Sequence, residues 1–118
     1  YIINHPIELS PLAKKLDDRP NYVERFQLII GGRIELMNAF TELNDPIDQE
    51  ERFKFQQSLN KKGDREAMKK DDAFIEALKY GMPPTTGLGM GIDRLVNVLT
   101  GTHNIKEVIL FPTLKPKK

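Results

Sequence analysis

Residues 22–46 read YVERFQLIIGGRIELMNAFTELNDP, and this stretch decides the fold. Its first part, residues 22–30, is rich in branched and aromatic side chains, which favour β-strands. The GGR triplet that follows predicts a hairpin turn, because adjacent glycines accept the positive φ values that such turns need. We therefore expect residues 22–30 to pair antiparallel with a returning strand over residues 34–42.

The returning strand carries an unusual set of side chains on one face. Strict alternation places Asn38, Phe40 and Glu42 together, whereas strands usually separate apolar from polar residues. This set suits a cation with an alkyl stem, because the carboxylate would meet the charge and the ring would cover the methylenes. The alternative is an edge hairpin with one solvated face. Glu35 points to the opposite face unless a β-bulge lies between it and Asn38.

Short helices and extended segments are predicted around this hairpin. Residues 1–15 predict an extended segment broken by prolines, and Asp45 before Pro46 predicts a helix N-terminus. In that helix Phe55 and Leu59 should lie one turn apart. A second helix is expected over 71–81, with Phe74, Ala77 and Leu78 on its apolar side, and a third over 92–101, with one apolar stripe made of Ile92, Leu95, Val96 and Leu99. A short buried strand is expected over 107–112. Together they predict the α+β class, an antiparallel sheet with flanking helices.

The glycine run GLGMGIDR, residues 87–94, is a second candidate for chemistry. Alternating glycines let a backbone lie close against a flat or phosphorylated ligand. The run leads into a helix N-terminus, which attracts negative charge, and Arg94 lies in that first turn. The spacing fits neither a Walker A loop nor a Rossmann fingerprint. The alternative is a strand packed tightly under a helix, with Arg94 on the surface.

Composition excludes several kinds of site. The chain of 118 residues carries 18 basic and 17 acidic residues, so its net charge of +1 argues neither for nor against nucleic acid. It has no cysteine, which excludes disulfides and thiolate-bound metals. His5 and His103 stand alone, so we expect no zinc site. No apolar run approaches the ~20 residues of a membrane-spanning helix, and we expect no membrane association.

The hairpin and the glycine run together resemble a known enzyme family. GLGMGIDRLV is similar to motif 3 of class II aminoacyl-tRNA synthetases, the glycine-rich strand and helix whose arginine contacts ATP. NHPIELSPLAKK, NAFTELNDPIDQEERF, ALKYGMPPTTGLGMGIDR and EVILFP resemble, in the same order, the C-terminal part of the lysyl-tRNA synthetase catalytic domain. SPLAK and NAFTELNDP favour the lysyl over the aspartyl and asparaginyl members. The resemblance runs from about residue 4 to residue 112, with motif 3 at about residues 84–100.

This resemblance implies a role for each candidate residue. Arg94 matches the arginine that stacks on adenine and reaches the terminal phosphate of ATP, and is the expected catalytic residue. Gly87, Gly89 and Gly91 match the floor of the ATP site. Asn38, Phe40 and Glu42 match the lysine pocket, in which Glu42 faces the ammonium group. Glu35 matches the carboxylate that binds magnesium on the ATP phosphates.

The sequence departs from the family pattern in two ways. The family has a second magnesium carboxylate on the preceding strand, where this chain has Gln27 or Leu28, and the hairpin is one residue longer at GGRIELM. A neutral amide binds magnesium more weakly than a carboxylate, because a hard cation prefers charged oxygen. Motifs 1 and 2 and the anticodon-binding OB domain have no counterpart here, so we expect this chain to be the last third or less of a synthetase.

The implied reaction is activation of lysine with ATP, followed by transfer of the lysyl group to tRNA(Lys). The implied cofactor is Mg²⁺, and the family implies a homodimer and a cytoplasmic location. We expect the isolated chain to be inactive. Two alternatives are a paralogue that lysylates an elongation factor and a non-enzymatic module derived from a synthetase.

Overall fold

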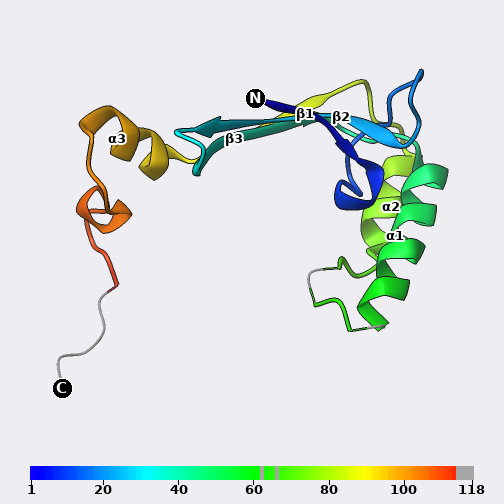
Figure 1. Cartoon of the computed structure of the whole chain (residues 1–118). Helices are drawn as coiled ribbons and strands as arrows, with labels where there is room; N and C mark the ends of the chain where they lie inside the picture. Colours follow the sequence, from blue (N-terminus) through cyan, green and yellow to red (C-terminus); the bar gives the residue numbers. More distant parts are fainter. Residues whose placement is uncertain (62, 66, 114–118) are drawn as a thin grey trace.

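The computed structural model describes residues 1–61, 63–65 and 67–113. In chain order its elements are β1 (Ile2–Pro6), the 3-10 helix η1 (Ile7–Leu9), β2 (Tyr22–Ile30), β3 (Ile34–Thr41), α1 (Pro46–Lys61), α2 (Asp72–Lys79), β4 (Thr86–Met90), α3 (Ile92–Thr100) and the 3-10 helix η2 (Ile105–Glu107). Within these residues the four strands form one antiparallel sheet in the order β1-β2-β3-β4 (Figure 1). The predicted α+β class and the central hairpin are confirmed.

A β-bulge interrupts the hairpin between β2 and β3. Leu28 pairs with Met37 and the next residue, Ile29, pairs with Glu35, so Leu36 has no partner across the ladder. Directly paired residues of an antiparallel sheet point to the same face. The extra residue therefore places Glu35 on the same face as Asn38. The two side chains can share a pocket only with such a bulge.

At one end of the sheet α1 and α2 pack against the loops that follow β1 and β3 (Figure 1). Asp45 caps α1 as predicted, accepting from the backbone N–H of Ile47 at 2.8 Å. The core lies here and includes Ala13, Val23, Leu43, Phe53, Ile75 and Leu78.

Phe55 and Leu59 lie one turn apart in α1, as predicted. The buried positions of this helix are mostly polar, Gln49, Arg52 and Gln56 beside Phe53, and Phe55 is 47% exposed. In α2 the buried residues are Ile75 and Leu78, whereas Phe74 is partly exposed and Ala77 is exposed. The predicted apolar side of α2 was therefore right for Leu78 and wrong for Phe74 and Ala77. Phe74 lies at the edge of the buried side, where its ring centroid is 6.1 Å from that of Phe53.

At the opposite end of the sheet α3 forms as predicted, ending at Gly101 with φ +69. Its apolar stripe is uncovered, since Ile92 and Leu99 are 64% and 75% exposed. The predicted buried strand over 107–112 was wrong: Glu107 ends η2, and residues 108–112 form turns, bends and irregular backbone. A strand needs a neighbour for its backbone groups, and residues 107–112 pair with no described strand.

The described chain is elongated. Its extents are 49 × 36 × 28 Å and its radius of gyration is 17.8 Å, whereas a compact domain of this length has about 13.5 Å. No helix in the described residues is both long and apolar enough to cross a bilayer.

Candidate functional site

One face of the sheet collects the predicted site residues. Gln27 pairs with Asn38, Asn38 pairs with Gly89, and Phe40 pairs with Gly87. Pairing and alternation therefore place on a single face Gln27 of β2, Glu35, Asn38 and Phe40 of β3, and Gly87 and Gly89 of β4. The register also resolves the choice between Gln27 and Leu28, because Leu28 points to the opposite face.

The glycine row has a charged side chain at each end. A Cβ on Gly87 would meet the carboxylate of Glu42, and a Cβ on Gly91 would meet Cδ of Arg94 at 3.1 Å. Between them a Cβ on Gly89 would meet no side chain, and the nearest atom to it would be the backbone oxygen of Asn38 at 3.8 Å. Four residues of strand separate the two ends by about 13 Å. An anionic and a cationic group thus flank an open strip of backbone on one face.

The backbone around Glu42 is fixed by two neighbouring segments. Its N–H donates to the carbonyl of Thr85 at 2.9 Å, and residue 42 bridges Ala13 on its other side. Burial raises the pKa of the Glu42 carboxyl above its ordinary 4.5. A cation that reached this carboxylate would replace the lost hydration and favour the ionised form.

Asn38 and Phe40 line a small cavity of about 130 Å³. The other residues around it are Leu9, Ser10, Pro11, Leu12, Ala13, Arg25 and Met68. Arg25, on the same face, donates from Nε to Oδ1 of Asn38 at 2.9 Å. Most of the lining is apolar, which suits an alkyl chain, and its polar side chains are Arg25 and Asn38 on the strands and Ser10 on the facing segment.

Arg94 lies at a larger cavity of about 720 Å³ between the hairpin end and α3. Its Nη1 donates to the backbone oxygen of Glu35 at 2.6 Å, which ties the helix to the bulge. The cavity is lined by Arg33, Ile34, Glu35, Arg94, Asn97, His103, Asn104 and Ile105. The two guanidinium groups outnumber the single carboxylate, that of Glu35, so the lining suits an anionic ligand such as a phosphate.

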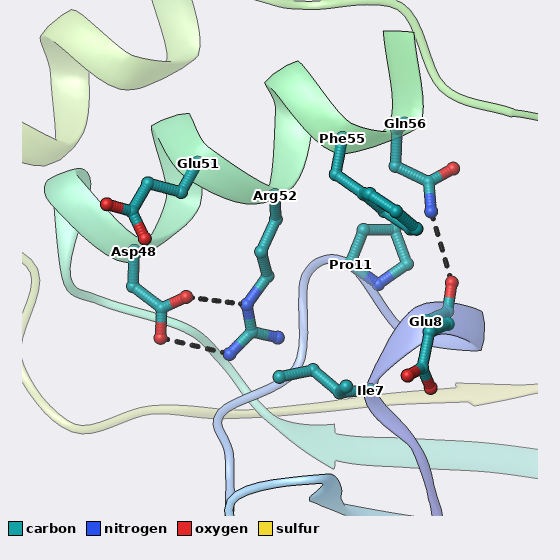
Figure 2. Close-up of a pocket in the computed structure, with 8 residues that line it drawn as sticks. All are labelled: Ile7, Glu8, Pro11, Asp48, Glu51, Arg52, Phe55 and Gln56. Atoms are coloured by element: carbon teal, nitrogen blue, oxygen red, sulfur yellow. Dashed lines mark hydrogen bonds and ion pairs between the residues drawn. The ribbon is translucent and has the colours of Figure 1, made fainter. Parts of the chain in front are cut away.

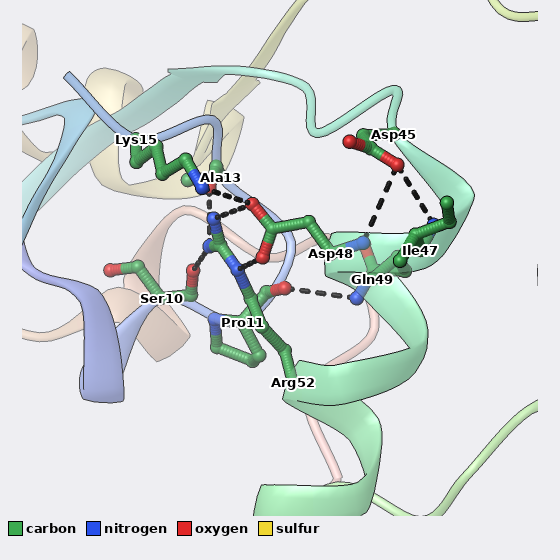
Figure 3. Close-up of polar contacts among 9 residues, drawn as sticks. All are labelled: Ser10, Pro11, Ala13, Lys15, Asp45, Ile47, Asp48, Gln49 and Arg52. Carbon is green, nitrogen blue, oxygen red and sulfur yellow. Dashed lines mark hydrogen bonds and ion pairs between the residues drawn. The ribbon is translucent and has the colours of Figure 1, made fainter. Parts of the chain in front are cut away.

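A polar side of α1 holds the segment 8–13 that borders the small cavity. Three side chains of α1 donate to its backbone carbonyls: Gln49 to Pro11 (3.0 Å), Arg52 to Ala13 (2.6 Å) and Ser10 (3.4 Å), and Gln56 to Glu8 (3.1 Å). Figure 3 shows the contacts of Gln49 and Arg52, and Figure 2 that of Gln56 beside a separate open cavity of about 320 Å³. The segment is therefore fixed by hydrogen bonds as well as by packing.

Asp48 completes this arrangement on α1. Its carboxylate accepts from Nε and Nη2 of Arg52 at 2.8 and 3.1 Å, and lies 3.3 Å from Nζ of Lys15. The hydrogen bond from Arg52 and the two positive charges hold the pKa of Asp48 below its ordinary 3.8. Arg52 is thereby aimed at the carbonyl groups of the segment (Figure 3).

Comparison with known proteins identifies the family. The family model for class II tRNA synthetases (D, K and N) matches residues 1–115. The chain belongs to this family. A lysine–tRNA ligase of Chloroflexus aurantiacus is 59% identical over 117 residues, which cover 99% of this chain and 24% of that protein. A lysine–tRNA ligase of Porphyromonas gingivalis is 56% identical over 118 residues, covering 100% of this chain and 20% of that protein.

The chain thus spans about a fifth to a quarter of the length of these curated relatives. The resemblance to class II lysyl-tRNA synthetases drawn from the motifs is confirmed by the family and by these relatives. The role of each candidate residue remains a prediction, and the geometry above gives the position of each residue on the sheet.

The predicted magnesium site has one carboxylate in this chain, that of Glu35. Glu35 and Gln27 share a face, but Oε1 of Gln27 lies 2.8 Å from Nε2 of His5 and is already hydrogen-bonded. The described residues contain no cluster of three or more His, Cys, Asp or Glu that could hold a metal. Magnesium commonly uses one or two carboxylates together with substrate phosphates. A single carboxylate at this position fits an ion that is carried mainly by the substrate phosphates, with Glu35 as the predicted protein ligand.

Sequence reasoning missed Arg25 and the polar side of α1. Extending the alternation from Gln27 back along the first strand would have placed Arg25 on the site face. Gln49, Arg52 and Gln56 recur at helical spacing, but polar residues at that spacing usually face water. Only the packed loop shows that they are buried.

Proposed function

We propose that this chain is the C-terminal part of the catalytic domain of a lysine–tRNA ligase, with motif 3 at about residues 84–100. The observation that carries the proposal is the glycine row with Glu42 at one end and Arg94 at the other. An amino acid with a cationic side chain and a nucleotide with anionic phosphates would lie end to end along this row. The identity to two lysine–tRNA ligases supports the same assignment.

The residues divide the substrate between them. Glu42 accepts the lysine ammonium, Phe40 covers the methylenes, and Asn38 contacts the polar end of the amino acid. Gly87, Gly89 and Gly91 form a floor that lets the ligand approach the backbone. Arg94 neutralises the phosphates and lies against the base, while Glu35 binds magnesium on the phosphates, with Gln27 as a weak neighbour.

The reaction follows from this alignment. The lysine carboxylate attacks the α-phosphorus of ATP, the bond to the bridging oxygen breaks, and lysyl-adenylate and pyrophosphate form. A hydroxyl of the terminal ribose of tRNA(Lys) then attacks the lysyl carbonyl, the bond to the phosphate breaks, and AMP leaves. These steps need no protein nucleophile, since positioning and charge neutralisation supply the catalysis. Because the sequence carries only part of such a site, we propose that the isolated chain is inactive and that the whole enzyme acts as a cytoplasmic homodimer.

Replacing Arg94 by alanine in the full-length protein tests the proposal. ATP–pyrophosphate exchange driven by lysine should fall at least a hundredfold, as on removal of other electrostatic groups from a transition state. Arg19→Ala is the matched control, because Arg19 is half exposed and, among the described residues, forms an ion pair only with Asp18, at 3.4 Å. Exchange near the wild-type rate in the Arg94 variant would refute the assignment.

A further inference from the structure

Arg25 makes three hydrogen bonds at the junction of the sheet and the segment 8–13. Besides its Nε bond to Asn38, its Nη1 donates to the backbone oxygen of Leu9 at 3.1 Å and to Oγ of Ser10 at 2.9 Å. A guanidinium presents its donors in a fixed planar fork, so three partners fix its orientation. Arg25 therefore has one defined position relative to β3.

This contact decides which end of the Asn38 amide faces outward. Its oxygen accepts from Arg25, so its NH₂ group is turned away from the guanidinium, and that group donates to no other atom in the described part of the chain. An amide held in this way offers two donors and little acceptor capacity. Its natural partner is a carboxylate or carbonyl oxygen.

Charge points to the same partner. The cation of Arg25 lies next to Asn38, whereas the carboxylate of Glu42 lies two alternations further along the strand. An ammonium group is repelled at the first position and attracted at the second, and a carboxylate shows the opposite preference. The pair thus gives the site a polarity along β3.

The segment that orients Arg25 is itself held from α1. Ser10, the hydroxyl partner of Arg25, is 4% exposed, and its backbone carbonyl accepts from Arg52 at 3.4 Å. Arg52 also donates to Ala13, the residue that bridges Glu42. The side chain of Arg52 therefore holds the backbone next to Arg25 and the backbone next to Glu42.

We propose that Arg25 is a positioning residue, which fixes the Asn38 amide as a hydrogen-bond donor to the carboxylate of the amino-acid substrate. This inference rests on the proposed function and deepens it. Arg25 acts through Asn38, and its charge orients the substrate so that the carboxylate lies toward Asn38 and the ammonium toward Glu42.

The test is equilibrium binding of lysine, of ATP and of lysinol, which has an alcohol in place of the carboxylate, to the full-length protein. Arg25→Lys keeps the charge but loses the planar fork. It should weaken lysine binding roughly tenfold or more, which is the range for a hydrogen bond to a charged group. ATP affinity should stay within about twofold, and lysinol affinity should change much less than lysine affinity.

Combining the change with Asn38→Ala separates positioning from a structural role. If Arg25 acts through Asn38, Arg25→Lys should have little further effect on lysine affinity in the Asn38→Ala background. Asn38→Asp is the second variant should Arg25→Lys not fold. It keeps an acceptor for Arg25, so its melting temperature should hold, yet it should bind lysine more weakly because the donor is gone.

Three outcomes would overturn the inference: wild-type lysine affinity in folded Arg25→Lys, equal losses for lysine and lysinol, or additive effects in the double variant. A wild-type protein that binds no lysine would instead overturn the proposed function, and the inference with it. The two failures are therefore distinguishable.

Discussion

At the end of β3, Glu42 holds a carboxylate partly out of water before any ligand is present. Burial raises its pKa above 4.5, so the ionised form is disfavoured in the folded protein. Its ionisation therefore costs stability above the raised pKa, and this cost disappears as the pH falls through that value. In the proposed site the lysine ammonium would offset the cost.

Glu42→Gln should accordingly separate stability from binding. At neutral pH and without ligand, the variant should melt at or above the wild-type temperature, while its lysine affinity should fall roughly ten- to hundredfold. ATP affinity should change little. Calorimetric titration with each ligand measures the difference, and Glu51→Gln, an exposed position on α1, is the control. Equal losses for lysine and ATP would contradict the pocket assignment.

The pH dependence of lysine binding gives a second test of the same residue. Since lysine pairs with the ionised carboxylate, its affinity should decrease as the pH falls through the raised pKa of Glu42. The glutamine variant should lack this decrease. A titration series from neutral to acid pH checks it, and an identical profile in both proteins would show that another group titrates.

Single residues were predictable where one strand decides their direction. Alternation placed Asn38, Phe40 and Glu42 together, and the pairing of Asn38 and Phe40 with β4 and the proximity of the Glu42 carboxylate to Gly87 bear this out. The contact of Arg25 with Asn38 joins two strands, so it depends on the register across the bulge. Local sequence does not encode that register strongly, because a slip of one residue exchanges the faces.

Among the elements, β4 gives a matched pair of glycine variants. A Cβ on Gly87 would collide with the Glu42 carboxylate, whereas a Cβ on Gly89 would make only an ordinary contact with the backbone oxygen of Asn38, at 3.8 Å. Gly87→Ala should therefore displace Glu42 and lower lysine affinity about tenfold or more. Gly89→Ala should fold normally and chiefly weaken ATP binding, because its methyl group would lie on the floor of the proposed nucleotide site. Unchanged lysine affinity in Gly87→Ala would place the ammonium elsewhere.

Helix α1 contributes through an ion pair that is mostly buried. Side chains of Arg52 and Asp48 are 9% and 16% exposed. Asp48→Ala would leave Arg52 poorly compensated and should lower the free energy of unfolding by about 3 kcal/mol at pH 7. Because the pKa of Asp48 is lowered, its contribution is complete above 3.8 and is lost as the pH falls through the folded value. The difference from wild type should therefore shrink in acid.

Urea unfolding at pH 7 and in acid measures this difference in the full-length protein. Glu50→Ala is a control on the same helix, since Glu50 pairs with Lys54 and Lys70 at the surface and should matter little. A loss of stability in Asp48→Ala that is independent of pH would indicate a packing effect instead of the charge.

The cap at Asp45 could be predicted from sequence, because the capping residue and the helix start are adjacent in the chain. The buried polar side of α1 could not, because it depends on carbonyl groups distant in the chain.

For the whole molecule, apolar surface explains the largest error of sequence reasoning. The stripe of α3 and residues 107–112 have the composition of buried elements, yet Leu99, Leu110 and Phe111 are 75%, 89% and 91% exposed. Composition predicts that a segment prefers burial, but the covering partner must be supplied by other residues. Hydrophobic patterning identified these elements and could not place them.

The same surface predicts how the isolated 118-residue chain behaves. Exposed apolar patches of this kind drive association in water, so the chain alone should form oligomers at micromolar concentration. Replacing Leu99 and Ile92 by lysine should reduce this association, because both lie on the exposed stripe. Light scattering coupled to size exclusion measures the mass. A monomer with a radius of gyration near the compact value of about 13.5 Å, well below the 17.8 Å of the elongated form, would mean that α3 folds back onto the sheet, and the open glycine strip would then be covered.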